Sequence, residues 1–343
     1  MKINSDTKKN LILLFVTIII TLVMFEGLIR IVYGNVKIWQ FPQMRHISTS
    51  YGYKLEPNQT GTYTTDFPIT TNSWGFRDDE WKVPKPKGVK RIMTLGDSLT
   101  FGNGAKYEEI FPTLLENKLK KLNSQVEVLN TSAIGWTTYN EVDFFTEEGI
   151  SYEPDILILC FFQNDYVTRP ENVQITLDDD GRRDARPEWL QFLPYKYIFL
   201  LKRSALISFV RLRLGAFLNA DKNPIDISSK STLDSRQDIT DTYSYIADLK
   251  EYCDKNKIKL IVVYIPAISR FAFPKDKSIL HLHMAENMKK NGITFFDLAE
   301  PFWNEKKPFK LYMYPWDNHL NAKGHKLIAD QLYTISVNAL EER

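Results

Sequence analysis

A serine and a histidine far apart in the chain carry residue types that together can perform acyl transfer. Ser98 lies in the turn Gly96–Leu99, directly after the apolar residues 92–95, and His319 lies near the C-terminus, two residues after Asp317. A serine hydroxyl is a weak nucleophile until an imidazole removes its proton, and a carboxylate holds that imidazole in the required tautomer. The pairing of this turn with a distant histidine and acid therefore predicts an acyl-transfer enzyme.

The elements that must position these residues are short apolar strands alternating with helices from residue 89 onward. The predicted strands cover residues 91–95, 126–130, 156–161, 260–265 and 293–296, and the predicted helices cover 108–122, 138–148, 238–256, 279–290 and 322–337. This alternation predicts an α/β fold with three α/β/α layers and a parallel sheet. Chemistry in such sheets lies at the carboxyl ends of the strands, where Ser98 and Asn164 both fall.

The N-terminal 33 residues have the pattern of a membrane anchor. Lysines precede an uncharged run at residues 11–25, and apolar character continues to Tyr33, so about 23 residues are available where a spanning helix needs roughly 20. Glu26 and Arg30 are four residues apart and can pair on a helix. No small-residue cleavage site follows the apolar core, which favours an uncleaved signal anchor over a cleaved signal peptide. The positive-inside rule then predicts a cytoplasmic tip and an extracytoplasmic remainder.

The rest of the chain divides by composition. Residues 34–88 are rich in Thr, Tyr, Pro, Asn and Gly, which predicts a β-rich stalk or cap ending in a linker. Residues 89–343 form the predicted catalytic domain, with an insertion at about 166–237. Within it, Trp189 to Leu218 mixes aromatic and leucine residues with Lys and Arg. We favour an amphipathic hairpin packed on the core; the alternative is a lid or a basic element lying on the membrane near the active site.

Composition excludes several other classes of protein. The chain has 44 Lys and Arg against 42 Asp and Glu, a formal charge of +2, which gives no reason to expect nucleic-acid binding. Cys160 and Cys253 lie in apolar or helical stretches without metal-ligand spacing, so both are interpreted as buried free thiols. We expect neither a metal nor a cofactor.

Four segments resemble the signatures of the GDSL, or SGNH, hydrolase family, and this resemblance covers about residues 90–340. In chain order they are Gly96–Leu99 as the first signature, residues 130–135 as the glycine segment, residues 163–165 as the Asn-Asp segment, and residues 317–319 with Asn321 and Gly324 as the terminal acid–histidine segment. The resemblance implies a flavodoxin-like catalytic domain and a serine hydrolase that acts on ester bonds.

The resemblance also implies a role for each motif residue. Ser98 would be the nucleophile, His319 the general base and acid, and Asp317 the residue that orients His319. The oxyanion would be held by the backbone N–H groups of Ser98 and Gly135 and by the side-chain amide of Asn164.

This sequence departs from the family pattern at two positions. Phe162 stands where the family usually has a glycine, two residues before Asn164. Trp316 stands where the family usually has its acid, three residues before His319, and Asp317 follows it. The closer spacing is associated with branches of the family that act on polysaccharide acyl groups. If the carboxyl does not reach the ring, the alternative is a Ser–His pair assisted by a backbone carbonyl.

Other residues near the motifs have plainer interpretations. Asp97 is predicted to stabilise the turn, and His325 to pack or cap within a helix. Phe101, Trp136 and Trp316 can either stack on sugar rings or belong to the core.

Together these features predict a membrane-anchored, extracytoplasmic serine esterase that acts on an O-acyl ester of a glycan or lipid. Two alternatives stay open from the sequence. One is an O-acyltransferase that moves the acyl group to a polysaccharide hydroxyl. The other is a non-catalytic module with the same fold that binds glycans or another membrane protein.

Overall fold

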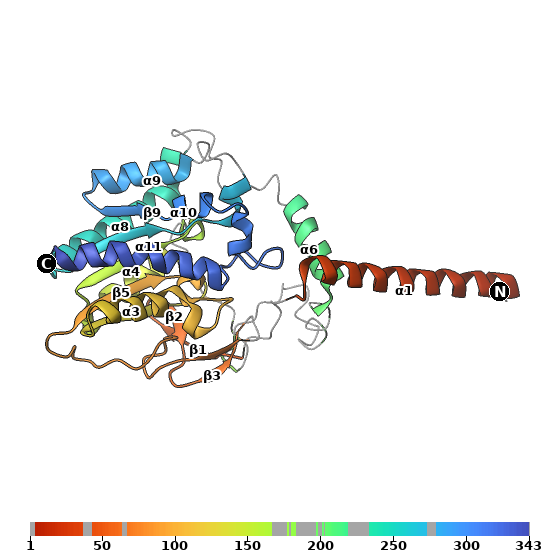
Figure 1. Ribbon diagram of the computed structural model, residues 1–343, viewed down its shortest axis with the longest axis horizontal. Helices are drawn as coiled ribbons and strands as arrows, with labels where there is room; N and C mark the ends of the chain where they lie inside the picture. The colour runs from red at the N-terminus through yellow and green to blue at the C-terminus, as the bar shows by residue number, and fades with distance from the viewer. Residues whose placement is uncertain are drawn as a thin grey trace.

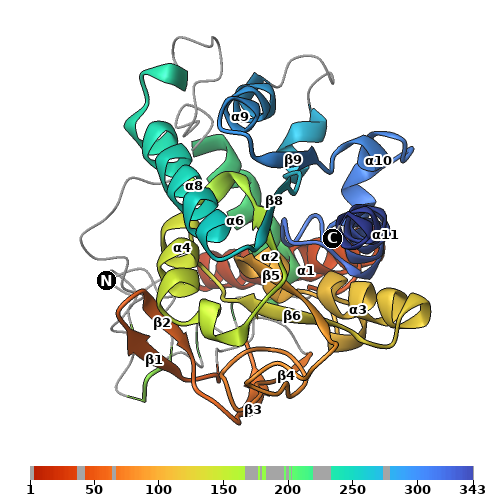
Figure 2. The same ribbon diagram turned by 90° about the vertical axis from the view of Figure 1, so that its left-hand side faces the viewer.

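A five-stranded parallel sheet forms the centre of the molecule (Figures 1 and 2). The computed structural model describes residues 4–36, 43–63, 67–166, 180–182, 203–218, 233–272 and 279–342, with the single positions 177, 197 and 201. In spatial order the strands are β6 (Val126–Ser132), β5 (Lys90–Gly96), β7 (Ile156–Phe161), β8 (Lys259–Tyr264) and β9 (Thr294–Asp297). All neighbouring pairs are parallel, so the five carboxyl ends meet at one edge.

Helices cover both faces of this sheet, as Figure 2 shows. Leu157 and Leu159 of β7 face one layer, whereas Ile156 and Ile158 face the other, because successive strand residues point to opposite sides. The three-layer α/β/α prediction is therefore confirmed. One layer consists of α4 (Thr138–Glu147), α8 (Gln237–Lys255) and α9 (Ile279–Lys290), and the other of α3 (Phe111–Leu122), α10 (Glu300–Trp303) and α11 (Ala322–Glu341).

The predicted elements differ from the observed ones mainly at their ends. The strand at 156–161 is predicted to the residue, because a run of apolar residues buried on both faces is unambiguous. The helix predicted from residue 108 begins only at Phe111, since residues 107–109 form a separate 3-10 turn and Pro112 favours the first turn of a helix.

Four short strands lie between the N-terminal helix and the sheet in the described residues. They form two antiparallel pairs, β1 (His46–Thr49) with β2 (Gly52–Leu55) and β3 (Thr60–Thr62) with β4 (Pro68–Thr70). The pair β1–β2 packs on the loop after β6. There the Tyr53 hydroxyl donates to the Ile134 carbonyl at 2.9 Å, and the Trp136 indole donates to the Tyr53 carbonyl at 2.8 Å. The β-rich segment therefore braces a loop at the carboxyl edge of the sheet.

Helix α1 (Ser5–Tyr33) projects away from the rest of the molecule in Figure 1. By length and composition it is sufficient to cross a membrane. The predicted pair of Glu26 and Arg30 is present, with the guanidinium and carboxylate 2.6 Å apart.

Most of the predicted insertion at about 166–237 lies outside the described residues, and α6 (Ala205–Leu218) is the helix described within it. The favoured prediction for this segment, packing on the core, is wrong for α6. This helix packs on α1 and on Trp316, because Ala205 and the partly buried Phe209 meet Ile29 of α1 in one apolar cluster.

Candidate active site

The turn after β5 places Ser98 at the carboxyl edge of the sheet. The strand ends at Gly96, and Asp97 caps the short helix α2 (Ser98–Phe101) by accepting the Leu99 N–H at 2.8 Å. A Cβ at Gly96 would lie 2.2 Å from the Thr100 hydroxyl oxygen, so the turn requires a residue without a side chain. The prediction that Asp97 stabilises this turn is confirmed.

The loop before α11 brings His319 to Ser98. The Nε2 atom of His319 lies 2.8 Å from Ser98 Oγ, although the two residues are 221 positions apart. Asn321 secures this loop: its Oδ1 caps α11, and its amide donates to the carbonyls of Lys310 and Tyr312, each at 2.8 Å. The motif asparagine therefore has a structural part in placing the imidazole.

Asp317 reaches the far side of the same imidazole. Its Oδ1 accepts the backbone N–H of His319 at 2.7 Å and also contacts ring Nδ1. A carboxylate two residues before the histidine can turn back in this way because a short Asx-type turn brings the side chain over the following backbone. The structure thus brings Ser98, His319 and Asp317 into one hydrogen-bonded chain.

The charges of His319 and Asp317 stabilise each other. Burial opposes a positive charge on His319, but the Asp317 carboxylate outweighs burial and raises the pKa of the imidazole above its ordinary value. Burial likewise opposes the charge on Asp317, and the His319 ring together with backbone N–H groups nevertheless lowers the pKa of that carboxyl. The arrangement therefore stabilises an imidazolium beside Ser98.

The predicted oxyanion donors lie after three neighbouring strands. Ser98 follows β5, Gly135 follows β6, and Asn164 follows β7. Gly135 has a φ of +87°, which favours glycine. The exposed Asn164 donates one amide N–H to Asp97 Oδ2 at 3.0 Å, and the same amide carries a second N–H. Asp97 therefore fixes Asn164 as well as the turn, a link that the sequence prediction missed.

Comparison with known proteins identifies the family of this chain. The model of the GDSL-like lipase/acylhydrolase family matches residues 94–327. The chain belongs to this family. The resemblance found in the sequence is thereby confirmed, as is the assignment to hydrolases that act on esters. No protein of curated function matches the chain.

Several solved structures are similar to this chain at low identity. Esterase EstA from Pseudoalteromonas sp. is 14% identical, with 74% of this chain and 99% of that chain covered and a TM-score of 0.43. A lipase/acylhydrolase from Enterococcus faecalis is 13% identical, with 72% and 94% covered and a TM-score of 0.41. A GDSL-like lipase from Bacteroides thetaiotaomicron is 15% identical, with 76% and 93% covered and a TM-score of 0.41.

Two further acids lie buried behind the turn of this family's first signature. Glu141 of α4 is fully buried, and neither carboxyl oxygen has a hydrogen-bond partner among the described residues. Asp165 is also fully buried and accepts the Phe162 N–H at 2.7 Å. Burial and the nearby acid Asp97 raise the pKa of both carboxyls well above the ordinary range. The only sequence signal for Glu141 is its place on the inward face of a predicted helix.

The aromatic residues near the motifs belong to the interior. Phe101, Trp136 and Trp316 are 1%, 0% and 5% exposed, so none of them presents a ring face for stacking on a sugar. His325 is buried too, and its Nδ1 accepts the Phe111 N–H at 3.3 Å, which caps α3 as predicted. Burial lowers the pKa of His325 to about 3, so it stays neutral.

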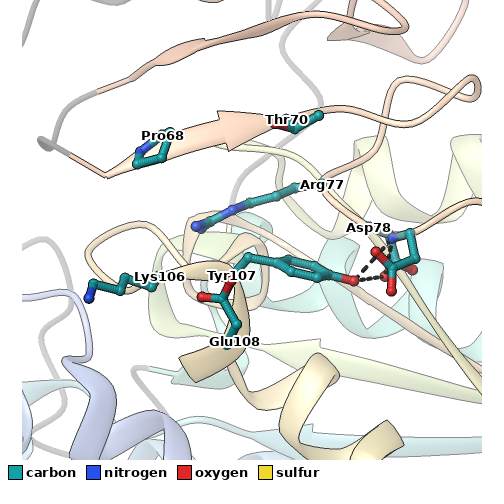
Figure 3. Close-up of a pocket in the computed structure, with 8 residues that line it drawn as sticks. Pro68, Thr70, Arg77, Asp78, Lys106, Tyr107 and Glu108 are labelled. Carbon is teal, nitrogen blue, oxygen red and sulfur yellow. Dashed lines mark hydrogen bonds between the residues drawn. The ribbon is translucent and has the colours of Figure 1, made fainter.

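Behind the loop that follows Ser98 is a separate cavity of about 520 Å³ (Figure 3). Its polar lining includes the buried Arg77, together with Asp78 and Tyr107, whose hydroxyl donates to the Asp78 carboxyl at 2.9 Å. The lining comes from β4, the turn after it and residues 106–108, and it includes neither Ser98 nor His319.

Proposed function

We propose that this protein is a membrane-anchored, extracytoplasmic serine esterase that hydrolyses an O-acyl ester of a glycan or lipid. The observation that carries the proposal is the continuous chain from Ser98 Oγ through both ring nitrogens of His319 to Asp317. A hydroxyl 2.8 Å from an imidazole nitrogen is within the range for proton transfer to a general base.

In the proposed first step, Ser98 Oγ attacks the ester carbonyl while His319 Nε2 takes the hydroxyl proton. The carbonyl oxygen becomes an oxyanion, held by the N–H groups of Ser98 and Gly135 and by the second amide N–H of Asn164. Collapse of this intermediate breaks the ester C–O bond, and His319 returns its proton to the leaving alkoxide. An acyl group then remains on Ser98.

Water completes the reaction by the same route in reverse. His319 removes a proton from water, the resulting hydroxide attacks the acyl carbon, and the Ser98 oxygen leaves and regains the proton. Asp317 keeps Nδ1 protonated throughout, so that Nε2 is the nitrogen free to accept. The products are a carboxylic acid and an alcohol.

The proposed location follows from α1 and the lysines ahead of its apolar run. A spanning helix whose apolar run is preceded by Lys8 and Lys9 is expected to leave its N-terminus in the cytoplasm and the catalytic residues outside. Esters available there are carried by cell-surface glycans and by lipids. Asp317 lies two residues before His319, a spacing shared with branches of the family that act on acylated polysaccharides. This spacing supports a glycan as the carrier of the ester.

Replacement of the proposed nucleophile tests the mechanism. In full-length detergent-solubilised protein, Ser98→Ala is expected to reduce kcat/KM on 4-nitrophenyl acetate by about 10³-fold or more, because the acyl-enzyme no longer forms. A fluorophosphonate probe is expected to label Ser98 in the unsubstituted protein and to leave the variant unlabelled. Ser151→Ala, in an exposed turn, is the matched control and should retain both properties. Full turnover by the Ser98→Ala variant would overturn the proposal.

A further inference from the structure

Helix α6 presents an apolar stripe that is exposed in the described part of the structure. Ile207, Val210 and Leu214 are 43%, 52% and 51% exposed. Their spacing of three and four residues puts them on one face of the helix, with the exposed Arg211 beside them. The opposite face, which includes Ala205, is buried. A helix with one apolar face packed and a second apolar face open requires an apolar medium on the open side.

The N-terminus of α6 is fixed to the anchor helix. Glu26 of α1 accepts the N–H groups of Ala205 and Leu206 at 3.0 and 2.8 Å, which caps α6 with a side chain from another helix. Tyr33 of α1 stacks on Phe209 at 5.5 Å between ring centroids. These contacts hold α6 at the level of the last two turns of α1.

That level corresponds to the outer boundary of a bilayer. The uncharged run at residues 11–25 of α1 rises about 22 Å, whereas the hydrocarbon core of a bilayer is ~30 Å thick. The turns from Glu26 onward must therefore lie at or just inside the interface, where a paired Glu26 and Arg30 can meet headgroups and water. Figure 1 shows α6 running across α1 and not alongside it, so α6 lies along the membrane plane when α1 spans it.

The carboxyl edge of the sheet, where Ser98 lies, is on the same side of the molecule as α1 and α6. Trp316, next to Asp317, packs edge-on against Tyr33 of α1 at 6.4 Å, and Arg213 of α6 donates to the Tyr314 hydroxyl at 2.9 Å. Figure 1 places the C-terminus, at the far end of α11, on the side of the molecule away from α1. The beginning of α11, and with it the loop of His319, is therefore the end nearer the anchor.

We propose that α6 is an interfacial helix whose stripe of Ile207, Val210 and Leu214 inserts into the outer leaflet of a phospholipid bilayer. It thereby seats the edge that carries Ser98 and His319 at the membrane surface. The inference rests on the membrane anchoring in the proposed function and specifies the surface that contacts lipid. The exposed Arg211 on the same helix favours leaflets with anionic headgroups. Esters displayed at the membrane surface then reach Ser98 directly.

Depth-dependent quenching of a fluorophore tests this placement. Single cysteines are introduced into the full-length protein as Val210→Cys on α6, Val16→Cys on α1 and Leu122→Cys at the distal end of α3, and each is labelled with an NBD maleimide. All three positions are exposed, whereas the native Cys160 and Cys253 are buried, so the unsubstituted protein is the labelling control. The proteins are reconstituted into vesicles of three parts phosphatidylcholine to one part phosphatidylglycerol, with or without doxyl-labelled lipid.

We expect lipid quenching at positions 16 and 210 and none at 122. At position 210 a shallow 5-doxyl lipid should quench at least twofold more than a 12-doxyl lipid. Quenching at 16 but not at 210 would overturn the inference while leaving the anchor intact. A blue-shifted but unquenched probe at 210 would also overturn it, because a second copy or another protein would then cover the stripe. Absence of quenching at 16 would overturn the anchoring itself.

Discussion

The ionisation of His319 decides when Ser98 can be activated. The imidazole must be neutral to accept the serine proton, yet Asp317 raises the pKa of the ring above its ordinary value despite burial. Activity is therefore expected to rise with pH through a pKa above the ordinary value of a histidine, since the free base is abundant only above that pKa. The same carboxylate stabilises the imidazolium that forms during attack. It therefore lowers the activation barrier, and it also reduces the fraction of neutral, active imidazole at low pH.

Asp317→Asn should separate these two effects. Without the carboxylate, the pKa of His319 falls, and the acidic limb of the kcat/KM profile should move to lower pH. At the plateau, activity should fall about 10³- to 10⁴-fold, because an amide no longer holds the ring in the productive tautomer. Profiles of hydrolysis between pH 5 and 9 measure both changes. Asp254→Asn, on the exposed end of α8, is the control. An unmoved acidic limb with a small loss of rate would instead indicate a Ser–His pair assisted by a backbone carbonyl.

Among the elements, the segment before β5 braces the loops of the site. Arg77 is 2% exposed, and its guanidinium donates to the carbonyls of Phe101, Gly102 and Ala105 at 3.2, 2.8 and 2.9 Å. These carbonyls belong to the end of α2 and the loop after it, so one side chain holds the backbone directly behind Ser98. On the neighbouring loop, Tyr53 performs a similar task for Ile134.

Removal of the guanidinium should loosen this brace. Arg77→Ala leaves three buried carbonyls without their donor and is expected to lower the free energy of unfolding by roughly 3 kcal/mol. Because the braced backbone continues directly from the short helix that begins at Ser98, kcat should fall more than KM rises. Arg77→Lys supplies a single ammonium in place of the planar guanidinium. It should recover only part of the lost stability and only part of the lost kcat. Urea unfolding and steady-state kinetics of the full-length protein measure these effects, with the exposed Lys255→Ala as control. Unchanged kcat in Arg77→Ala would show that the loop holds without the brace.

On the scale of the whole molecule, several wholly or partly buried acids share one consequence for stability. Burial raises the pKa of Asp78 to about 7 and raises the pKa values of Glu141 and Asp165 as well. The folded protein therefore keeps protons that the unfolded chain releases above about pH 4. Stability from these groups is fully present below the unfolded pKa values and is lost as pH rises through the folded ones. The free energy of unfolding should thus decline between pH 4.5 and pH 7.

Glu141→Gln tests this account, because it replaces the ionisable carboxyl by a neutral group of the same shape. The variant should be more stable than the unsubstituted protein at pH 7.5, by on the order of 1 kcal/mol, and the difference should shrink toward pH 4.5. Melting of the full-length protein at several pH values measures it. Glu305→Gln, on the surface, should change nothing. A variant destabilised equally at both pH values would mean that the carboxyl makes a contact that a Gln amide cannot replace.

Much of the architecture and the family followed from local patterns in the sequence. Strand β7 was predicted to the residue, and Ser98 and His319 were singled out, because apolar runs and turn residues report on their own few neighbours. The helix ending at Leu122 was predicted to begin too early, since local periodicity does not separate a 3-10 turn from the helix that follows it.

Only the tertiary structure decided how side chains from distant segments meet. It determined that Asp317 turns back onto His319, that Arg77 braces the loop behind Ser98, and that Glu141 is buried with no hydrogen-bond partner in the described part of the chain. It also placed α6 on α1, where the sequence favoured packing on the core. These outcomes depend on which surfaces remain open once the sheet and its helices have assembled. A pattern of neighbouring residues along the chain carries no record of that choice, because packing energy is a property of the assembled fold.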